Sequence, residues 1–526
     1  MKPFTVACCQ LRAFDIEDAE SNLEQMLAAL DEAGRADAQL ALLPEGSYPA
    51  YYLRDESPYE RANVRSYAEV TALLGAKCKK YGFWLAAGLA APHESGGVTN
   101  SGVVFGPDGE IRGQYDKAFL WHFDNTWFVP GDSYPVFDSG FCKFGILICA
   151  DGRPPEIARS LAVNGAELIV DLTAWVASGR TMSDLKNSQC EYLMPVRALE
   201  NGVWVAAADK WGSEDGTIMY TGSSCVIDPT GTTVARAGTS ETTILLHEIT
   251  SMATEITTRR PSLYSQLTSP YDELPISEVL REPMIPADEN RRVAVVPGNN
   301  GFDAAHVAAT FESLRDQDVD LTVFAGMSAP ESWEDQLPAI EAAVRDRSGM
   351  LAFAVETQGP FAVRTGLLVT PDRTYEHRAT HGNGVDTGEL PAAVIPTSIG
   401  NVAILCGDEG MVPEVARCLT LEGADILAWS AFETFPLIEK VARARSDANH
   451  VYTAVSWPES ATIMSPSGAP IIDAPAGLNV AMAAQVNKAV ARWKDMAPGT
   501  NVIRDRRPED YGDLVRSHGV SPAVTS

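Results

Sequence analysis

The feature that most constrains the fold of this chain is a repeat within its own sequence. Residues 413–427 read PEVARCLTLEGADIL, and residues 155–169 read PEIARSLAVNGAELI. Shorter runs in the second half resemble runs of the first half in the same order, at residues 292–297, 321–326, 401–408 and 445–454. An ordered match of this length indicates that a whole domain has been duplicated, rather than a short solenoid unit repeated.

The stretch between the two halves has a different character. Residues 256–290 contain several prolines, polar side chains and a short acidic run, and their apolar residues show no clear period. Such a composition is typical of a linker. With 526 residues, the chain is also long enough for two domains. We therefore expect domains at 1–255 and 291–490, joined by this linker and followed by a polar C-terminal tail at 491–526.

Apolar runs alternate with helical periods along the first half. Residues 4–9, 39–43 and 168–172 are short apolar runs typical of buried strands, whereas residues 68–80 and 155–164 have the spacing of helices. Turns of the Gly-Pro-Asp-Gly and Asp-Pro-Thr-Gly type add hairpins to this alternation. The pattern predicts a mixed α/β fold rather than a purely parallel sheet.

Cys149 is the first candidate for chemistry. It follows a short apolar run and begins a polar turn, after which residues 157–163 have helical spacing. A cysteine at such a junction lies near backbone N–H groups that favour an anion, so we expect its thiol pKa to be lowered and the thiol to be a nucleophile. The alternative is a buried structural cysteine.

Two charged residues stand at the ends of other predicted strands. Glu45 closes the apolar run at 39–43, and burial there would raise its carboxyl pKa and suit it to act as a base. Lys117 ends another predicted strand, where an ammonium group can donate to an oxyanion. Each alone could be a solvated surface charge. Because strand ends on one edge of a sheet converge, Glu45, Lys117 and Cys149 together predict a site.

The composition indicates which kinds of partner the protein has and in which cell compartment it lies. The formal net charge is −29, which argues against nucleic acid and anionic membranes as partners. The nine cysteines form no C-x-x-C pair and no zinc-like cluster with histidine, as expected for thiols in a reducing cytoplasm and for a protein without a metal or other cofactor. The sequence has no apolar run long enough for a membrane span and no signal peptide at its start, so we expect a cytoplasmic protein.

Several motifs of the first half occur in the order of a known family. They are Leu-Leu-Pro-Glu45, Tyr-Asp-Lys117 and Ile-Cys149-Ala-Asp-Gly-Arg-Pro-Pro-Glu, supported by the runs at 197–201 and 222–231. Over residues 1 to about 250 the chain thereby resembles the nitrilase, or carbon–nitrogen hydrolase, superfamily. The resemblance implies a four-layer α-β-β-α sandwich and a Glu–Lys–Cys triad. Two such sandwiches usually pair in that family, so the tandem halves are expected to form an intrachain pseudo-dimer.

The resemblance also implies roles for individual residues. Glu45 would take the thiol proton and later activate water, while Cys149 would attack the substrate and form a thioester. Lys117 and the backbone N–H of Ala150 would stabilise the oxyanion. Amide-cleaving relatives often carry a second glutamate after the lysine. Asp124 is the candidate for that second carboxylate in this chain, and a purely structural aspartate is the alternative.

The residues after the cysteine bear on the substrate. Nitrile-cleaving relatives tend to have Cys-Trp-Glu, whereas this chain resembles the amidases and N-carbamoyl amino acid amidohydrolases, in which an arginine four residues past the cysteine binds a substrate carboxylate. Arg153 has that place, with pairing to Glu156 or Asp151 as the alternative. Trp175 could line the pocket or belong to the core. We expect a small amide or carbamoyl substrate; a nitrilase and a non-catalytic scaffold are the alternative functions.

The second half departs from the motifs of the first. Gly326 stands opposite Glu45, and residues 375–378 read Tyr-Glu-His-Arg opposite Lys117. Cys406 remains, at a distance from the following Pro-Glu pair that is one residue longer. We therefore expect the second half to be catalytically silent and to serve as a built-in partner for the first. Pseudo-dimeric chains of this kind could assemble further into a homo-oligomer.

Overall fold

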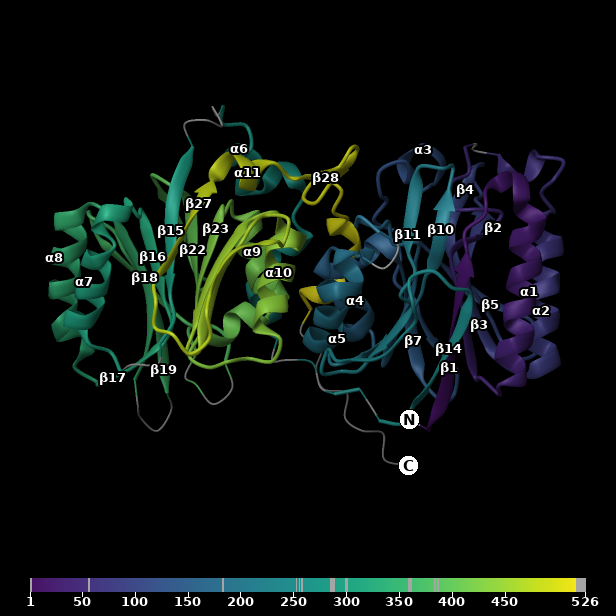
Figure 1. The fold of residues 1–526 in the computed structure, drawn as a ribbon, viewed down its shortest axis with the longest axis horizontal. Helices are drawn as coiled ribbons and strands as arrows, with labels where there is room; N and C mark the ends of the chain where they lie inside the picture. The colour runs from purple at the N-terminus through teal and green to yellow at the C-terminus, as the bar shows by residue number, and fades with distance from the viewer. Residues whose placement is uncertain are drawn as a thin grey trace. The chain divides into compact units, whose positions relative to one another are not determined.

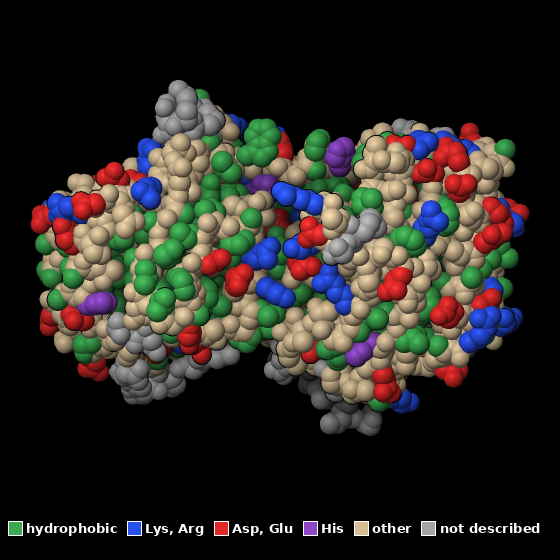
Figure 2. Space-filling model, viewed as in Figure 1, with side chains coloured by type: hydrophobic (Ala, Val, Ile, Leu, Met, Phe, Trp, Pro, Cys, Tyr) green, Lys and Arg blue, Asp and Glu red, His purple; other side chains and the backbone are tan. Residues whose placement is uncertain are grey.

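The computed structural model describes residues 2–516 except 55–56, 182–183, 252, 255, 257–258, 284–288, 299–300, 358–361, 383–384 and 386. The chain forms two compact units. Unit 1 comprises Met1–Ile256 with Asp495–Asn501 and Asp505–Asp513, and unit 2 comprises Thr257–Lys494 with Val502–Arg504 and Leu514–Ser526. Figure 2 shows acidic side chains spread over both units. Among the described helices, none offers the stretch of apolar residues that crossing a lipid bilayer requires.

Unit 1 consists of two sheets between two layers of helices (Figure 1). The first sheet has the order β11-β10-β1-β2-β3-β4-β5, with β14 also paired to β1. Its strands are β1 (Phe4–Arg12), β2 (Leu40–Tyr48), β3 (Trp84–Pro92), β4 (Val98–Phe105), β5 (Ile111–Asp116), β10 (Lys210–Glu214), β11 (Ile218–Thr221) and β14 (Thr243–Ile249). Helices α1 (Ala19–Arg35) and α2 (Tyr67–Tyr81) pack on it.

The second sheet of unit 1 has the order β13-β12-β9-β8-β7-β6. Its strands are β6 (Val136–Asp138), β7 (Lys143–Ile148), β8 (Leu168–Leu172), β9 (Trp204–Ala208), β12 (Cys225–Ile227) and β13 (Thr233–Arg236). Helices α4 (Pro155–Val163) and α5 (Met194–Asn201) cover its outer face, and the short α3 (Asp124–Trp127) follows β5. Strands β2 and β4 of the first sheet pack on β8 and β7 of the second, so the layers are α-β-β-α.

Local sequence signals explain where the helices begin and end. In α2, the Ser66 hydroxyl accepts from the backbone N–H of Glu69, whose carboxylate accepts from the backbone N–H of Ser66, a capping box that satisfies two N–H groups at the helix start. The helix ends at Gly82, whose φ of +74° suits a residue without a Cβ atom. Leu74 and Cys78 lie on the buried face of the helix, within the core between α1, α2 and the first sheet.

Unit 2 repeats these layers and their strand order. One sheet runs β20-β19-β18-β16-β15-β27 with β17 beside β18, and the other runs β21-β22-β23-β24-β25-β26. Their bounds are β15 (Asn290–Val296), β16 (Leu321–Phe324), β17 (Met327–Ala329), β18 (Met350–Thr357), β19 (Val363–Val369), β20 (Thr374–Arg378), β21 (Val394–Thr397), β22 (Gly400–Cys406), β23 (Ile426–Ser430), β24 (Tyr452–Trp457), β25 (Ser460–Met464), β26 (Pro470–Ala474) and β27 (Met482–Asn487). Its helices are α6 (Pro275–Val279), α7 (Ala304–Ser313), α8 (Leu337–Arg347), α9 (Pro413–Leu421), α10 (Ile438–Asn449) and α11 (Lys488–Arg492).

The α/β fold expected from the sequence is confirmed. Strands β1 to β5 of unit 1 have counterparts in β15, β16, β18, β19 and β20, and α4 and α5 have counterparts in α9 and α10. The hairpin of β10 and β11, in contrast, occurs only in unit 1 among the described strands. Pairing of the two sandwiches as a pseudo-dimer stays a prediction.

Part of the polar C-terminal stretch folds onto unit 1. Residues 495–501 form a small hairpin of β28 (Asp495–Ala497) and β29 (Thr500–Asn501). Further along, Arg506 Nε lies 3.4 Å from Glu156 Oε1 on α4, and both side chains are almost completely buried. The ring of Tyr511 stacks on that of Tyr134 with centroids 6.3 Å apart. Single contacts of this kind, rather than a periodic apolar face, attach this segment.

We predict that replacing Arg506 by Met lowers the free energy of unfolding of the full chain by about 3 kcal/mol, because the variant breaks a buried ion pair with Glu156. Chemical denaturation measures the change. Arg507→Met is the matched control: its ion pair with Asp510 involves a side chain that is 23% exposed, so a loss below about 1 kcal/mol is expected. Equal losses in both variants would contradict the assignment.

Candidate active site

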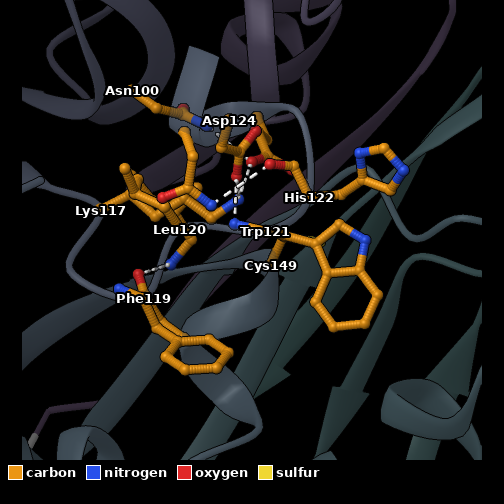
Figure 3. A network of polar contacts seen from close by, with 12 residues as sticks. Asn100, Lys117, Phe119, Leu120, Trp121, His122, Asp124 and Cys149 are labelled. Atoms are coloured by element: carbon orange, nitrogen blue, oxygen red, sulfur yellow. Dashed lines mark hydrogen bonds and ion pairs between the residues drawn. The ribbon is translucent and has the colours of Figure 1, made fainter. Parts of the chain in front are cut away.

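The three residues expected at strand ends come together in unit 1. Glu45 lies within β2, Lys117 directly follows β5, and Cys149 directly follows β7. The side chains of Glu45 and Lys117 are fully buried, and Cys149 is 8% exposed. Strands β2 and β5 end at the same edge of the first sheet, and β7 faces them from the second sheet. Figure 3 shows Lys117 and Asp124 next to each other, with Cys149 close by.

Lys117 is held between two carboxylates. Its Nζ donates to Glu45 Oε1 at 2.7 Å and to Asp124 Oδ2 at 2.6 Å. Asn100 Nδ2 donates to the same Glu45 oxygen at 2.7 Å, and the backbone N–H of Trp121 donates to Asp124 Oδ2 at 2.9 Å. Asp124, the candidate second carboxylate, is therefore a direct partner of the lysine in this geometry. Lys117 thus links the end of β2 to the turn that follows β5.

The electrostatics of this network favour a charged lysine and a basic glutamate. Burial lowers the pKa of Lys117, but the carboxylates of Asp124 and Glu45 outweigh it and hold the pKa well above its usual value. Burial raises the pKa of Glu45, Asp124 raises it further, and Lys117 opposes both. Among the described residues, Glu45 Oε2 has no hydrogen-bond partner. A buried carboxylate oxygen of this kind is suited to accept a proton.

Cys149 has a backbone conformation that is uncommon for a residue with a side chain. Its φ is +48°, in the left-handed region, at the start of the turn Cys149–Gly152. The backbone N–H of Cys149 donates to Asp171 Oδ1 on β8 at 3.0 Å. Such strained conformations persist only where the surroundings fix them, and they are common at active sites. The turn orients the cysteine at the end of its strand.

The expected lowering of the Cys149 pKa is wrong. Burial raises the pKa of the thiol well above its usual value, the Glu45 carboxylate raises it further, and Lys117 only partly opposes them. The sequence places the cysteine at the end of a strand near backbone N–H groups, whereas the structure buries the thiol beside the Glu45 carboxylate. The resting nucleophile is therefore a thiol, which needs a base to remove its proton.

Asp151 ties the cysteine turn to the lysine turn. Its carboxylate accepts from the backbone N–H of Ile148 at 3.0 Å, from that of Phe119 at 2.7 Å and from the hydroxyl of Tyr115 at 2.7 Å. Burial raises its pKa to about 6. The sequence pattern indicated Asp151 only as an alternative partner of Arg153, and no local pattern distinguishes Asn100.

The two candidate substrate residues lie in different surroundings. The Arg153 guanidinium lies over the Trp121 ring, 4.7 Å from its centroid, and the residue is half-buried. Trp175 is completely buried. The side-chain amide of Gln189 has one orientation in which both of its ends make hydrogen bonds. Its oxygen then accepts from the Trp175 indole N–H at 3.3 Å, and its nitrogen donates to the Cys149 carbonyl at 2.6 Å. Trp175 therefore supports the backbone of the nucleophile in this arrangement.

Matching hydrogen bonds identify the equivalent positions in unit 2. Asp151 accepts from the backbone N–H of Ile148, and Glu409 accepts from that of Cys406 at 3.0 Å. Gly407, with a φ of +61°, therefore corresponds to Cys149. Matching Cys406 with Cys149 is therefore wrong by one residue. Cys406 ends its strand, as Ile148 does, and is completely buried.

The lysine position is also changed in unit 2. The backbone N–H of Lys117 donates to the Asn100 carbonyl, and that of Ala379 donates to the Arg364 carbonyl at 3.0 Å. Ala379 therefore takes the place of Lys117, one residue beyond the Tyr-Glu-His-Arg run at 375–378. Gly326 stands in the place of Glu45, and Gly407 in that of Cys149. Unit 2 thus lacks all three of the side chains expected in the site.

Large side chains occupy the corresponding space in unit 2. A Cβ atom on Gly326 would lie 2.5 Å from Phe432 Cδ1, and one on Gly407 would lie 3.2 Å from Phe432 Cδ2. The Arg364 guanidinium lies over this ring at 4.9 Å and pairs with Asp408 at 2.7 Å. Unit 2 therefore lacks the three reactive side chains, and other side chains fill the space beside their positions. Both observations exclude the Glu–Lys–Cys chemistry of unit 1 from these positions of unit 2.

Comparison with known proteins identifies the family to which unit 1 is similar. The Carbon-nitrogen hydrolase family matches residues 5–258. Omega-amidase NIT2-B of Xenopus laevis is 32% identical over 237 residues, which are 42% of this chain and 81% of that protein. The chain belongs to the carbon–nitrogen hydrolase family. It is an amidase-like hydrolase of the nitrilase superfamily.

Two further comparisons extend the set of relatives of this carbon–nitrogen hydrolase. A nitrilase of Pyrococcus abyssi is 33% identical over 237 residues, covering 44% of this chain and 85% of that protein. An amidase from Nesterenkonia sp., known from its crystal structure, is 27% identical, with a TM-score of 0.42, covering 47% of this chain and 90% of that one.

We predict that Glu45→Gln lowers the thiol pKa of Cys149, because the variant removes a carboxylate that raises it. The rate of Cys149 alkylation by iodoacetamide, followed by peptide mass spectrometry across pH, reports this pKa. Its midpoint should move to lower pH in Glu45→Gln. The control Glu110→Gln, which changes an exposed carboxylate, should leave the midpoint in place. A midpoint that is unchanged or higher in Glu45→Gln would refute the electrostatic account.

Proposed function

We propose that the enzyme hydrolyses the linear amide of a small molecule through a thioester on Cys149. The observation that carries the proposal is the buried Lys117 ammonium group between Glu45 and Asp124. Such an arrangement supplies a base and a fixed cation within one dry site. Amide hydrolysis needs both, because a proton must leave the nucleophile and negative charge must develop on the carbonyl oxygen.

Acylation begins with removal of the thiol proton. Glu45, whose raised pKa makes it a stronger base than an exposed carboxylate, takes the proton as the Cys149 sulfur attacks the amide carbon. Lys117 and the backbone N–H of Ala150 donate to the oxyanion that forms. The C–N bond then breaks, the proton passes from Glu45 to the leaving nitrogen, and ammonia or an amine departs.

Deacylation uses the same groups in reverse. Glu45, again ionised, takes a proton from water, and the resulting hydroxide attacks the thioester carbon. Lys117 stabilises the second oxyanion, and collapse of this intermediate returns the proton to the sulfur and releases the acid. Asp124 holds Lys117 charged and oriented throughout, because its carboxylate keeps one side of the ammonium group satisfied at 2.6 Å.

The substrate class rests on Arg153. A guanidinium group suits a carboxylate, and its place after Cys149 supports an amide or carbamoyl compound that carries one. The relative named omega-amidase supports the amide, and the relative named nitrilase supports a nitrile as the second candidate. Release of ammonia from a panel of amides, N-carbamoyl amino acids and nitriles separates these candidates.

Location and assembly are part of the same proposal. The net charge of −29 supports a freely diffusing enzyme without nucleic acid or membrane as a partner. Its reduced cysteines suit the cytoplasm: all nine are free in the structure. In this proposal the two sandwiches of one chain pair with each other, and such chains could associate further.

We predict that Cys149→Ala abolishes ammonia release while the far-ultraviolet circular dichroism spectrum is retained, because removing the nucleophile of a concerted unit removes most catalysis. Cys406→Ala is the matched control, a second buried cysteine that ends the equivalent strand in unit 2. Its turnover should equal that of the parent. Activity close to the parent's in Cys149→Ala would overturn the proposed mechanism.

We predict that Arg153→Ala raises KM for carboxylate-bearing amides roughly 30-fold, the equivalent of losing a charge-assisted hydrogen-bonded pair of about 2 kcal/mol. The KM for neutral amides of similar size should change far less. Steady-state kinetics on matched substrates give both values. Equal changes for the two substrate types would show that Arg153 has no selective contact with the carboxylate.

A further inference from the structure

The hairpin of the C-terminal segment contacts the turn that carries Asp124. The hydroxyl of Thr500, in β29, accepts from the backbone N–H of His122 at 2.7 Å, and it lies 3.5 Å from the Leu120 carbonyl, to which it donates. The carbonyl of Gly499 accepts from Asn125 Nδ2 at 3.2 Å. Thr500 is 1% exposed, so its hydroxyl is shielded from water. These contacts span more than 370 residues of sequence within unit 1.

The contacted turn has a strained residue at its centre. His122 has a φ of +48°, which is costly for a residue with a Cβ atom and persists only where surrounding groups hold it. On either side of it, Trp121 and Asp124 bond to each other: the Trp121 N–H donates to the Asp124 carboxylate, and the Asp124 N–H donates to the Trp121 carbonyl at 2.8 Å. Figure 3 shows Leu120, Trp121 and His122 leading from Lys117 toward Asp124.

This turn connects Lys117 to Asp124 along the chain. Lys117 and Asp124 are seven residues apart, and the Asp124 carboxylate reaches Nζ at 2.6 Å. A shift of the turn would move that carboxylate relative to the ammonium group and thereby move the oxyanion donor. The Thr500 hydroxyl, which is itself buried, accepts from the part-buried backbone N–H of His122 at the point where the turn is strained. Removing this hydroxyl would leave that N–H without its acceptor.

We propose that Thr500 is a positioning residue of the active site, and that the segment following the second sandwich thereby completes the site of the first. The inference rests on the proposed function, because its effect on turnover requires the amidase reaction. The Thr500 hydroxyl acts through the backbone of His122 on Asp124, and through Asp124 on Lys117. It does not touch the reacting atoms.

Two variants of the full chain test the effect of the Thr500 hydroxyl separately from that of the side-chain shape. Thr500→Val keeps the shape of the side chain and removes the hydrogen bond, whereas Thr500→Ser keeps the hydroxyl. We expect Thr500→Val to lower kcat for a neutral amide roughly ten-fold or more, since small misplacements of catalytic groups have large effects on rate. KM should stay within about two-fold, and Thr500→Ser should restore kcat. A parental kcat in Thr500→Val, or an equal loss in Thr500→Ser, would overturn the proposal.

A readout that does not depend on turnover separates this proposal from the proposed function. Hydrogen–deuterium exchange of the peptide covering residues 119–127 should be faster in Thr500→Val than in the parent or in Thr500→Ser. Asp495→Ala is the control, because Asp495 accepts a hydrogen bond from Asn501 inside the hairpin and is exposed; exchange at 119–127 should match the parent. Unchanged exchange in Thr500→Val would refute the positioning role even in a protein that hydrolyses no amide.

Discussion

The active site depends on one buried cation shared by two carboxylates. An ammonium group in a dry interior is costly unless its charge is compensated and its hydrogen bonds are made. Glu45 and Asp124 provide that compensation by bonding to the same Lys117, while burial and the Asp124 carboxylate hold the pKa of Glu45 above its usual value. Glu45 therefore remains basic at a place where it has an oxygen without a hydrogen-bond partner among the described residues. The base and the oxyanion donor arise from the same interaction.

The second unit shows that the fold does not need this chemistry. It keeps the strand order and the carboxylate that caps the turn after the nucleophile strand, as Glu409 in place of Asp151. Gly407 keeps the left-handed backbone of Cys149 without a side chain, and Phe432 fills the space beside Gly326. The turn geometry is thus present with and without the reactive side chains, and the packing beside it differs between the two units.

Much of this could be predicted from the sequence, and the failures have physical causes. Apolar periods predict a mixed α/β fold and the repeat predicts its duplication, because burial imposes a period on every element, whereas the four layers followed from the resemblance to the family. Glu45, Lys117 and Cys149 could be found because polar residues at strand ends are conspicuous. The direction of the Cys149 pKa was wrong, since it depends on tertiary burial beside Glu45. Thr500 had no signal, because a single hydroxyl in a polar segment creates no pattern.

The central claim is that Cys149 carries the acyl group. Rapid acid quenching of the parent enzyme during amide turnover, followed by proteolysis and mass spectrometry, tests it directly. The account predicts the mass of the acyl group on the peptide containing Cys149, removable by hydroxylamine as expected for a thioester, and none on the peptide containing Cys406. Ammonia release without any adduct on Cys149, or an acyl group on another residue, would contradict it.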